Sequence, residues 1–351
     1  MDKEEKSTAG HDETAVEDKI AHGFESHIAG TDIALGIVND SPVSSVSAAE
    51  ERRVLRKIDW IIMLMPMITF TMQYIDKVIL NGAAQVGIIQ DLHLYTVQGI
   101  NPKTHEPILN LKRFSNVTLI FYWGCLTGLL PASYLAQRLP IAKFLGCTVI
   151  VWGGVVMLTV TCKSYQGFLV QRAGERDRQV LPRHTECAVA PGFSIVISMW
   201  WRRTQQLPRF SIWYTSCAFG ALVGSLLIYG IGHIHGSLAQ WKYQYLILDA
   251  ITVMWGVFMV FALPNNPVTA YFLNERQKVV AIERMRSEQT GIENNKFKLY
   301  QVKEALVDPK TWIMFATTFC IHFVNGSVSG FGSIIVNSFG HSHLKAIALQ
   351  R

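Results

Sequence analysis

The sequence has few charged residues for its length. Only 17% of its 351 residues are Asp, Glu, Lys or Arg, whereas 50% are hydrophobic. A soluble globular chain usually carries about 25% charged residues. The apolar residues gather in runs of about 20, the length at which a helix crosses the ~30 Å hydrocarbon core of a bilayer. The scarcity of charge therefore predicts an all-α polytopic membrane protein embedded in a lipid bilayer.

Other features are absent too. We recognise no Gly-rich phosphate loop and no catalytic triad. His233 and His235 have no further metal-ligating residues near them in the sequence. We therefore expect neither an enzyme nor a cofactor. The six cysteines lack paired spacing, which favours small buried thiols over disulfides or metal ligands. The net charge of +6 lies mainly in loops on one side, which fits the positive-inside rule and does not indicate nucleic-acid binding. The N-terminus has no signal-peptide pattern.

Composition divides the chain into four segments. We expect a disordered cytoplasmic tail at 1–50, a transmembrane bundle at 51–263, a basic central loop at 264–309, and the start of a second bundle at 310–351. Basic clusters before the first span and in alternate loops predict a cytoplasmic N-terminus. The predicted spans are Trp60–Leu80, Asn116–Ala136, Ile141–Cys162, a damaged fourth span that includes Cys187–Trp201, Phe210–Gly232, Gln244–Leu263 and Lys310–Val336.

The central loop contains two short helical patterns. Asn274 is a plausible N-cap with Gln277 as its capping-box partner. A second patch covers Tyr300–Leu306, and Asp308 and Pro309 suit the start of the next span. The expected apolar edge of the first helix carries Val279, Ile282 and Met285. Its solvent-facing side is expected to carry Glu275, Arg276, Lys278, Glu283, Arg284 and Arg286.

The fourth span is interrupted by charge. Between Arg172 and Glu186 the chain reads Ala-Gly-Glu-Arg-Asp-Arg-Gln-Val-Leu-Pro-Arg-His-Thr, and each charge at mid-bilayer costs a few kcal/mol. The apolar run Cys187–Trp201 that follows is too short to span. Residues 173–185 therefore disrupt the predicted span.

Several separate motifs carry a family resemblance. They are Gln73-Tyr74-Ile75-Asp76-Lys77, the segment Pro131–Gly146, Ala190-Pro191-Gly192-Phe193 with Trp200, Glu275–Ile292 and Val302–Trp312. Together they resemble the major facilitator superfamily, and within it the fungal anion:cation symporters of the allantoate permease type. The resemblance covers roughly Glu51 to Leu349. It implies two six-helix halves that rock around a midplane site.

The sequence departs from the family in two places. The family's fourth span runs from an Arg to a Glu about two turns later. Arg172 and Glu186 match these ends, but the stretch between them is twice the expected length and looks like a retained intron or a frameshift. The family has twelve spans, and this sequence stops at the start of an eighth. The resemblance therefore implies a partial fold, with the first six-helix half and about one helix of the second.

The resemblance implies a substrate-binding or coupling role for Gln73, Tyr74, Asp76, Lys77, Arg172, Glu186 and Asn325. A charge inside a span is a functional candidate by default. Lys77 would attract a carboxylate, and Asp76 would carry a proton or hold Lys77. The alternative is that both reach the headgroups from the outer end of the span.

Other polar and aromatic residues have two interpretations each. Arg138 and Lys143 suit a conformational latch or plain loop charges. His322, like Asn325, suits hydrogen bonding between helices. Trp213 and Tyr214 suit a cavity wall or ordinary packing.

The expected function is secondary active transport at the plasma membrane. The resemblance implies uptake of a small organic anion such as allantoate, ureidosuccinate or nicotinate, coupled to a proton. One alternative is a non-transporting fragment or mispredicted gene model of such a permease. A second alternative, from the number of spans, is a seven-helix receptor.

Overall fold

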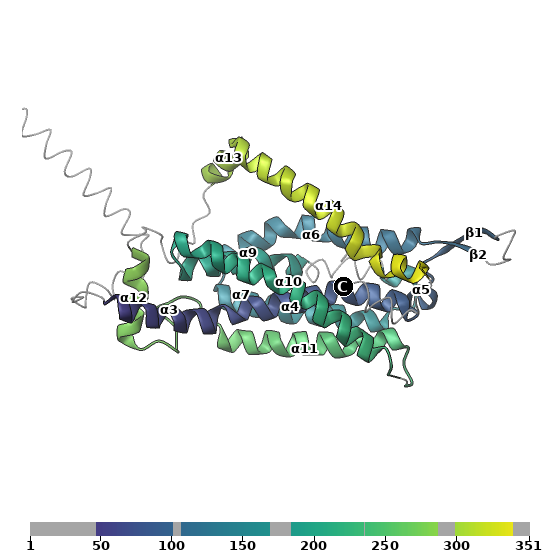
Figure 1. Cartoon of the computed structure of the whole chain (residues 1–351), viewed down its shortest axis with the longest axis horizontal. Helices are drawn as coiled ribbons and strands as arrows, with labels where there is room; N and C mark the ends of the chain where they lie inside the picture. The colour runs from purple at the N-terminus through teal and green to yellow at the C-terminus, as the bar shows by residue number, and fades with distance from the viewer. Residues whose placement is uncertain (1–46, 101–106, 169–183, 235, 287–298, 340–351) are drawn as a thin grey trace, which may run out of the picture.

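The computed structural model describes residues 47–100, 107–168, 184–234, 236–286 and 299–339. Most helices run along the long axis of the molecule (Figure 1). The helices are α3 Ala48–Ile62, α4 Leu64–Gln85, α5 Ile88–Asp91, α6 Lys112–Arg138, α7 Ile141–Met157, the 3-10 turn η1 Leu158–Thr161, α9 His184–Trp200, α10 Arg203–Ile231, α11 Gln240–Ala262, α12 Glu275–Arg286, α13 Leu299–Val307 and α14 Pro309–Ser338.

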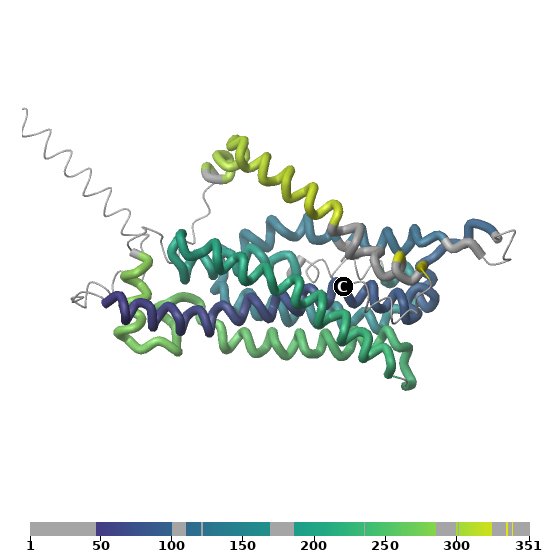
Figure 2. Tube along the Cα trace, viewed as in Figure 1, coloured from purple at the N-terminus to yellow at the C-terminus, as the bar shows by residue number. Residues whose placement is uncertain are grey.

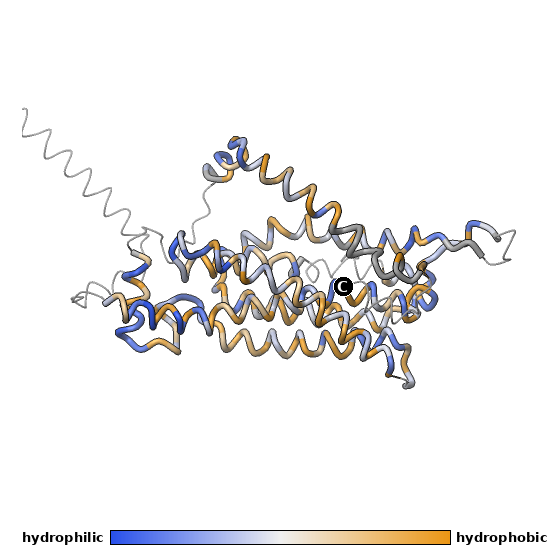
Figure 3. The backbone as a smooth tube through the Cα atoms, viewed as in Figure 1, coloured by the Kyte–Doolittle hydropathy of each residue, from blue (hydrophilic) through white to orange (hydrophobic). Residues whose placement is uncertain are grey.

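Within these ranges, five helical segments are long and apolar enough to cross a membrane. They are Ala48–Gln85, Lys112–Arg138, Ile141–Thr161, Arg203–Ile231 and Gln240–Ala262. They correspond to five of the predicted spans, and Figure 3 shows hydrophobic residues along the middle of the bundle. The predicted helical membrane fold is confirmed. The apolar helix Glu186–Trp200 of the damaged fourth span is shorter, and residues 173–183 of the charged stretch lie outside the described residues.

A small sheet interrupts the otherwise helical fold between α5 and α6. Strands β1, Thr96–Ile100, and β2, Pro107–Asn110, pair antiparallel with a bulge between Val97 and Gly99. The span pattern of the sequence indicated no strand in this connection. The β-branched residues Thr96 and Val97 are the local signal that favours a strand here.

Helices α4 and α10 approach closely through small residues. A Cβ atom added at Gly220 would lie 2.6 Å from the Thr71 carbonyl oxygen, and one at Gly224 would lie 3.1 Å from Ile75 Cγ1. Such distances leave no room for a side chain, so the two backbones meet directly. Gly220 and Gly224 are four residues apart, the small-residue spacing that allows such close helix contact.

Helices α7 and α11 form a second close pair. A Cβ atom at Gly146 would lie 2.9 Å from the Val260 backbone nitrogen, and one at Gly256 would lie 2.8 Å from the Ile150 nitrogen. By contrast, a Cβ atom at Gly154, also on α7, would meet nothing within 4 Å.

This contrast predicts opposite effects for the same substitution at two sites in one helix. Gly146→Ala should lower the free energy of unfolding by about 1–3 kcal/mol, because the added methyl group collides with backbone that cannot rotate away. Gly154→Ala should raise it by up to about 1 kcal/mol, because alanine favours a helix and the site is open. Thermal unfolding of the purified variants in detergent measures both. Equal effects would contradict the close contact between α7 and α11.

Helix α12 lies beside α3 at one end of the bundle, which we call the α3 end (Figures 1 and 2). The Asn274 backbone N–H donates to Gln277 Oε1 at 3.3 Å, as the capping box predicts. Ile282 and Met285 are buried, as predicted for the apolar edge, whereas Val279 is only half-buried and its neighbour Val280 is buried instead. Further along, the Lys310 N–H donates to Asp308 Oδ1 at 2.9 Å, which confirms the cap expected for α14.

Candidate functional site

The candidate site is built on one stripe of α4. Phe70, Tyr74 and Lys77 follow one another at helical spacing and therefore share a face. Lys77 Nζ lies 5.0 Å from the centre of the Tyr74 ring, within cation–π range. The Lys77 side chain is exposed although Asp76 and Val78 on either side of it are buried. Lys77 is thus the accessible residue of this turn, while its ammonium remains beside the Tyr74 ring.

Glu186 at the start of α9 brings a second charge to this stripe. Gln73 Nε2 donates to the Glu186 carbonyl oxygen at 3.0 Å, which fastens α9 to α4 one turn from Lys77. The Lys77 ammonium is attracted to Glu186 and also interacts with Tyr122 of α6. The structure thus brings together four of the predicted residues, namely Gln73, Tyr74, Lys77 and Glu186.

Asp76 belongs to a different environment. It is only 6% exposed, and its Oδ2 accepts a hydrogen bond from Trp152 Nε1 of α7 at 3.3 Å. Its Oδ1 has no hydrogen-bond partner among the described residues. The suggestion that Asp76 holds Lys77 is therefore wrong for this structure. Successive residues of a helix point about 100° apart, so the two charges face different neighbours.

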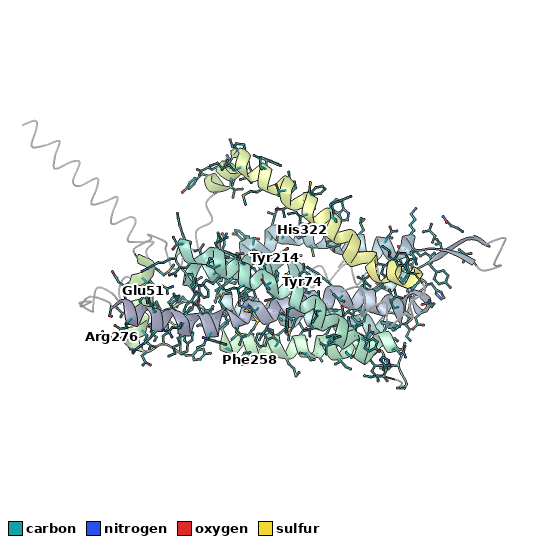
Figure 4. The ribbon with its side chains drawn as sticks, in the orientation of Figure 1. Glu51, Tyr74, Tyr214, Phe258, Arg276 and His322 are labelled. Atoms are coloured by element: carbon teal, nitrogen blue, oxygen red, sulfur yellow. The ribbon has the colours of Figure 1, made fainter. Side chains whose placement is uncertain are left out.

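An aromatic cavity adjoins the same stripe. It has a volume of about 430 Å³ and is lined by Phe70, Phe210, Ser211, Trp213 and Tyr214. Tyr74 and Tyr214 lie near each other in the middle of the bundle (Figure 4). Of the two interpretations given for Trp213 and Tyr214, the structure therefore favours the cavity wall.

The remaining predicted residues lie elsewhere. Arg138 lies over the Tyr134 ring at 5.0 Å, and Lys143 is exposed on α7. Asn325 belongs to α14, as does the exposed His322 (Figure 4). Arg172 lies outside the described residues.

A polar cluster that the sequence analysis missed joins the helices at the α3 end. Arg209 Nη2 lies 2.8 Å from Asp59 Oδ2, and Arg209 Nε lies 3.1 Å from Asp59 Oδ1, which makes the ion pair bidentate. Trp201 Nε1 donates to the same carboxylate at 2.7 Å. Since Asp59 comes from α3, Arg209 from α10 and Trp201 from the turn before α10, this carboxylate ties three segments together.

Arg284 of α12 joins the α3 end as well, which corrects a prediction. It was expected to face solvent, but it is only 3% exposed and donates through Nη2 to the Trp200 carbonyl oxygen at 2.8 Å. Burial lowers the pKa of Arg284 to about 10, so the side chain remains charged at neutral pH. Arg202 completes the contact, donating to the Arg284 carbonyl oxygen at 2.9 Å and pairing with Glu51 at 3.0 Å.

Asp249 is a further buried acid that the sequence analysis passed over. It lies in α11 and is only 1% exposed. A carboxylate within an apolar run is itself a signal of function, and the rule that identified Asp76 would have identified Asp249 too. Across the described residues, no group of three or more His, Cys, Asp or Glu side chains is arranged to hold a metal ion.

Comparison with known proteins places these features in a family. Residues 66–349 match the Major Facilitator Superfamily. An uncharacterized transporter of Schizosaccharomyces pombe is 33% identical over 304 residues, which cover 87% of this chain and 54% of that protein. The allantoate permease of Saccharomyces cerevisiae is 30% identical over 325 residues, or 91% of this chain and 56% of that protein. The chain thus spans little more than half the length of these relatives.

A solved structure agrees with the fold. A bacterial homologue of the human lysosomal transporter Spinster, in an inward-facing and unoccupied conformation, superposes with a TM-score of 0.58 at 14% identity. The match covers 87% of this chain and 59% of that one. With its apolar helices and its family match, the chain is an integral, multi-pass membrane protein that belongs to the major facilitator superfamily.

Proposed function

We propose that this chain binds a small organic anion and takes part in carrying it across the membrane together with a proton. The observation that carries the proposal is the placement of Lys77. Lys77 is accessible on the α4 stripe, and its ammonium interacts with groups that α6 and α9 supply. A cation inside a membrane bundle needs a partner or a wet cavity, and a substrate carboxylate meets this need.

Relatives and charge support an anion as the substrate. One relative from Saccharomyces cerevisiae is named an allantoate permease, which supports an anion. Another from the same organism, 32% identical over 300 residues, is named a thiamine pathway transporter and supports transport without indicating an anion. Family membership favours a transporter over a seven-helix receptor. We take allantoate, ureidosuccinate and nicotinate as the first candidates to test, because each presents a carboxylate that Lys77 can attract.

Asp76 is the proposed proton carrier. Its carboxylate is buried and receives one hydrogen bond from Trp152, and its second oxygen has no partner among the described residues. A buried carboxylate is expensive to keep charged, and protonation removes that cost. A proton taken up at Asp76 would change the charge beside α7 and so couple to the arrangement of the helices.

Membrane placement forms part of the proposal. Basic residues at 52–57 and 202–209 mark the loops at the α3 end, and the positive-inside rule puts such loops in the cytoplasm. We therefore propose a plasma-membrane protein with a cytoplasmic N-terminus. The bundle at 51–263 and the loop at 264–309 remain the proposed domain division.

Reconstitution of the full chain in proteoliposomes tests the proposal. Uptake of radiolabelled allantoate, ureidosuccinate or nicotinate should be saturable and should increase when the outside is made acidic. Equilibrium binding of the same compounds to the chain in nanodiscs provides a second readout. If neither measurement detects saturable uptake or binding of any of these carboxylates, the proposal fails.

The variant Asp76→Asn separates proton coupling from binding. The amide cannot carry a proton but keeps the size and an acceptor for Trp152 Nε1. Accumulation driven by the pH gradient should be lost, while exchange of labelled for unlabelled substrate at equal pH should persist. If Asp76→Asn accumulates substrate as the parent chain does, Asp76 is not the proton carrier.

A further inference from the structure

We propose that the aromatic cavity holds a planar ring attached to the carboxylate that Lys77 attracts. The substrate class would then be monocyclic aromatic carboxylates, in preference to aliphatic acids of the same size. The inference rests on the proposed anion transport and adds to it a specificity-determining residue, Trp213.

The cavity is lined by aromatic rings of α4 and α10, and a further ring, Phe193 of α9, packs against Trp213. Trp213 of α10 lies at the centre of this group. Its ring centre is 4.7 Å from that of Phe70 on α4, at an interplanar angle of 61°. It lies 6.1 Å from Phe193 on α9 and 5.8 Å from Phe210 on α10. Offset and edge-to-face rings at such distances attract one another, and a planar guest ring extends the same pattern.

The indole N–H of Trp213 differs from most indole N–H groups described in this chain, because it has no hydrogen-bond acceptor among the described residues. Trp213 is 6% exposed. A buried indole N–H normally finds a partner. Other tryptophans in this chain do so: Trp152 donates to Asp76, Trp201 to Asp59, Trp241 to Asp91 and Trp255 to Thr69. Trp200 shares the lack of an acceptor, but its ring stacks on Phe272 and does not line the cavity.

Lys77 connects this cavity to a positive charge. The ring centres of Phe70 and Tyr74 are 6.4 Å apart, and Lys77 Nζ lies 5.0 Å from the centre of the Tyr74 ring. A ring seated beside Phe70 and Trp213 would therefore direct its carboxylate along Tyr74 toward the ammonium. A surface that faced only lipid chains would not carry an ammonium on the same stripe. The charge therefore favours an anionic guest over a lipid tail.

The volume of the cavity suits a small guest. Small-molecule sites usually enclose about 300–1,000 Å³, and this cavity measures about 430 Å³. A single ring with a short carboxylate arm fits within that space.

Two probes of equal charge and similar size test the inference. Benzoate has a flat π face, whereas cyclohexanecarboxylate is puckered and has none. We expect the full chain in nanodiscs to bind benzoate about fivefold more tightly, because ring-on-ring contacts exceed the gain from burial alone. Isothermal titration calorimetry measures both affinities on one preparation.

Variants at Trp213 identify the source of the preference. Trp213→Leu should bind the two acids within a factor of two, because it removes the central ring. Trp213→Phe should retain most of the preference, because it keeps a ring and removes the unpaired N–H. Trp60→Phe is the matched control, since Trp60 is 78% exposed and lies away from the cavity on α3. It should leave both affinities unchanged.

The outcomes separate this inference from the proposed function. Equal binding of both acids by the parent chain would overturn the aromatic subsite and leave anion binding intact. A preference that survives in Trp213→Leu would also overturn it, because another part of the chain would then recognise the ring. Binding of neither acid, and of none of the candidate anions, would overturn both proposals.

Discussion

Replacing Lys77 by glutamine should weaken carboxylate binding by about 100-fold for every acid tested. Truncating one partner of a desolvated charge pair costs about 2–5 kcal/mol. The effect should be uniform across substrates, because Lys77 recognises the carboxylate and not the body of the molecule. Equilibrium binding in nanodiscs measures it, and Lys77→Arg should recover part of the affinity because it keeps the positive charge.

The companion residue Glu186 needs its own control. Without Lys77, the buried Glu186 carboxylate loses a nearby cation, and this alone can lower the yield of folded protein. The double variant Lys77→Gln with Glu186→Gln removes that imbalance. It should recover the yield, judged by a single peak in size exclusion, without recovering affinity. Normal binding by the double variant would show that Lys77 serves only to neutralise Glu186.

Arg209→Gln should lower the free energy of unfolding by about 2 kcal/mol. The Arg209 and Asp59 side chains are 15% and 31% exposed, so the value falls between about 0–1 kcal/mol for a surface pair and 3–5 kcal/mol for breaking a buried one. The substitution leaves Asp59 with Trp201 as its donor but removes both guanidinium contacts. Thermal and denaturant unfolding in detergent measure the change.

Arg203→Gln is the matched control for this experiment. Arg203 is exposed at the start of α10, six positions from Arg209. It should change stability by less than about 0.5 kcal/mol. A double-mutant cycle with Asp59→Asn then isolates the pair energy. If Arg209→Gln and Arg203→Gln behave alike, the Asp59–Arg209 pair contributes nothing to stability.

Features that depend on local sequence were predictable. The apolar runs located the long helices because span length follows from bilayer thickness. The four-residue spacing of Gly220 and Gly224 indicates a close helix contact. Asn274 and Asp308 indicate where helices start. Each of these signals is contained within a few residues, so no knowledge of distant segments was needed.

Features that depend on a distant partner were not predictable. Asp76 and Lys77 are adjacent in sequence, yet they have different partners. Asp76 accepts a hydrogen bond from Trp152 of α7, and Lys77 is attracted to Glu186 of α9. Arg284 looked solvent-facing because its acceptor, the Trp200 carbonyl oxygen, lies 84 residues away. The pattern of a helix shows which residues share a face, but it does not show what that face meets.

The contact between α3 and α12 has a consequence for biosynthesis. Arg276 of α12 pairs with Glu50 of α3 across 226 residues. A ribosome adds about 5–20 residues per second, so roughly 10–45 s separate the synthesis of these two partners. During that interval the transmembrane helices are already entering the bilayer, while the buried site for Arg284 beside Trp200 stays open. The α3 end of the newly made bundle therefore stays uncovered until α12, which is translated after the sixth span, has been made.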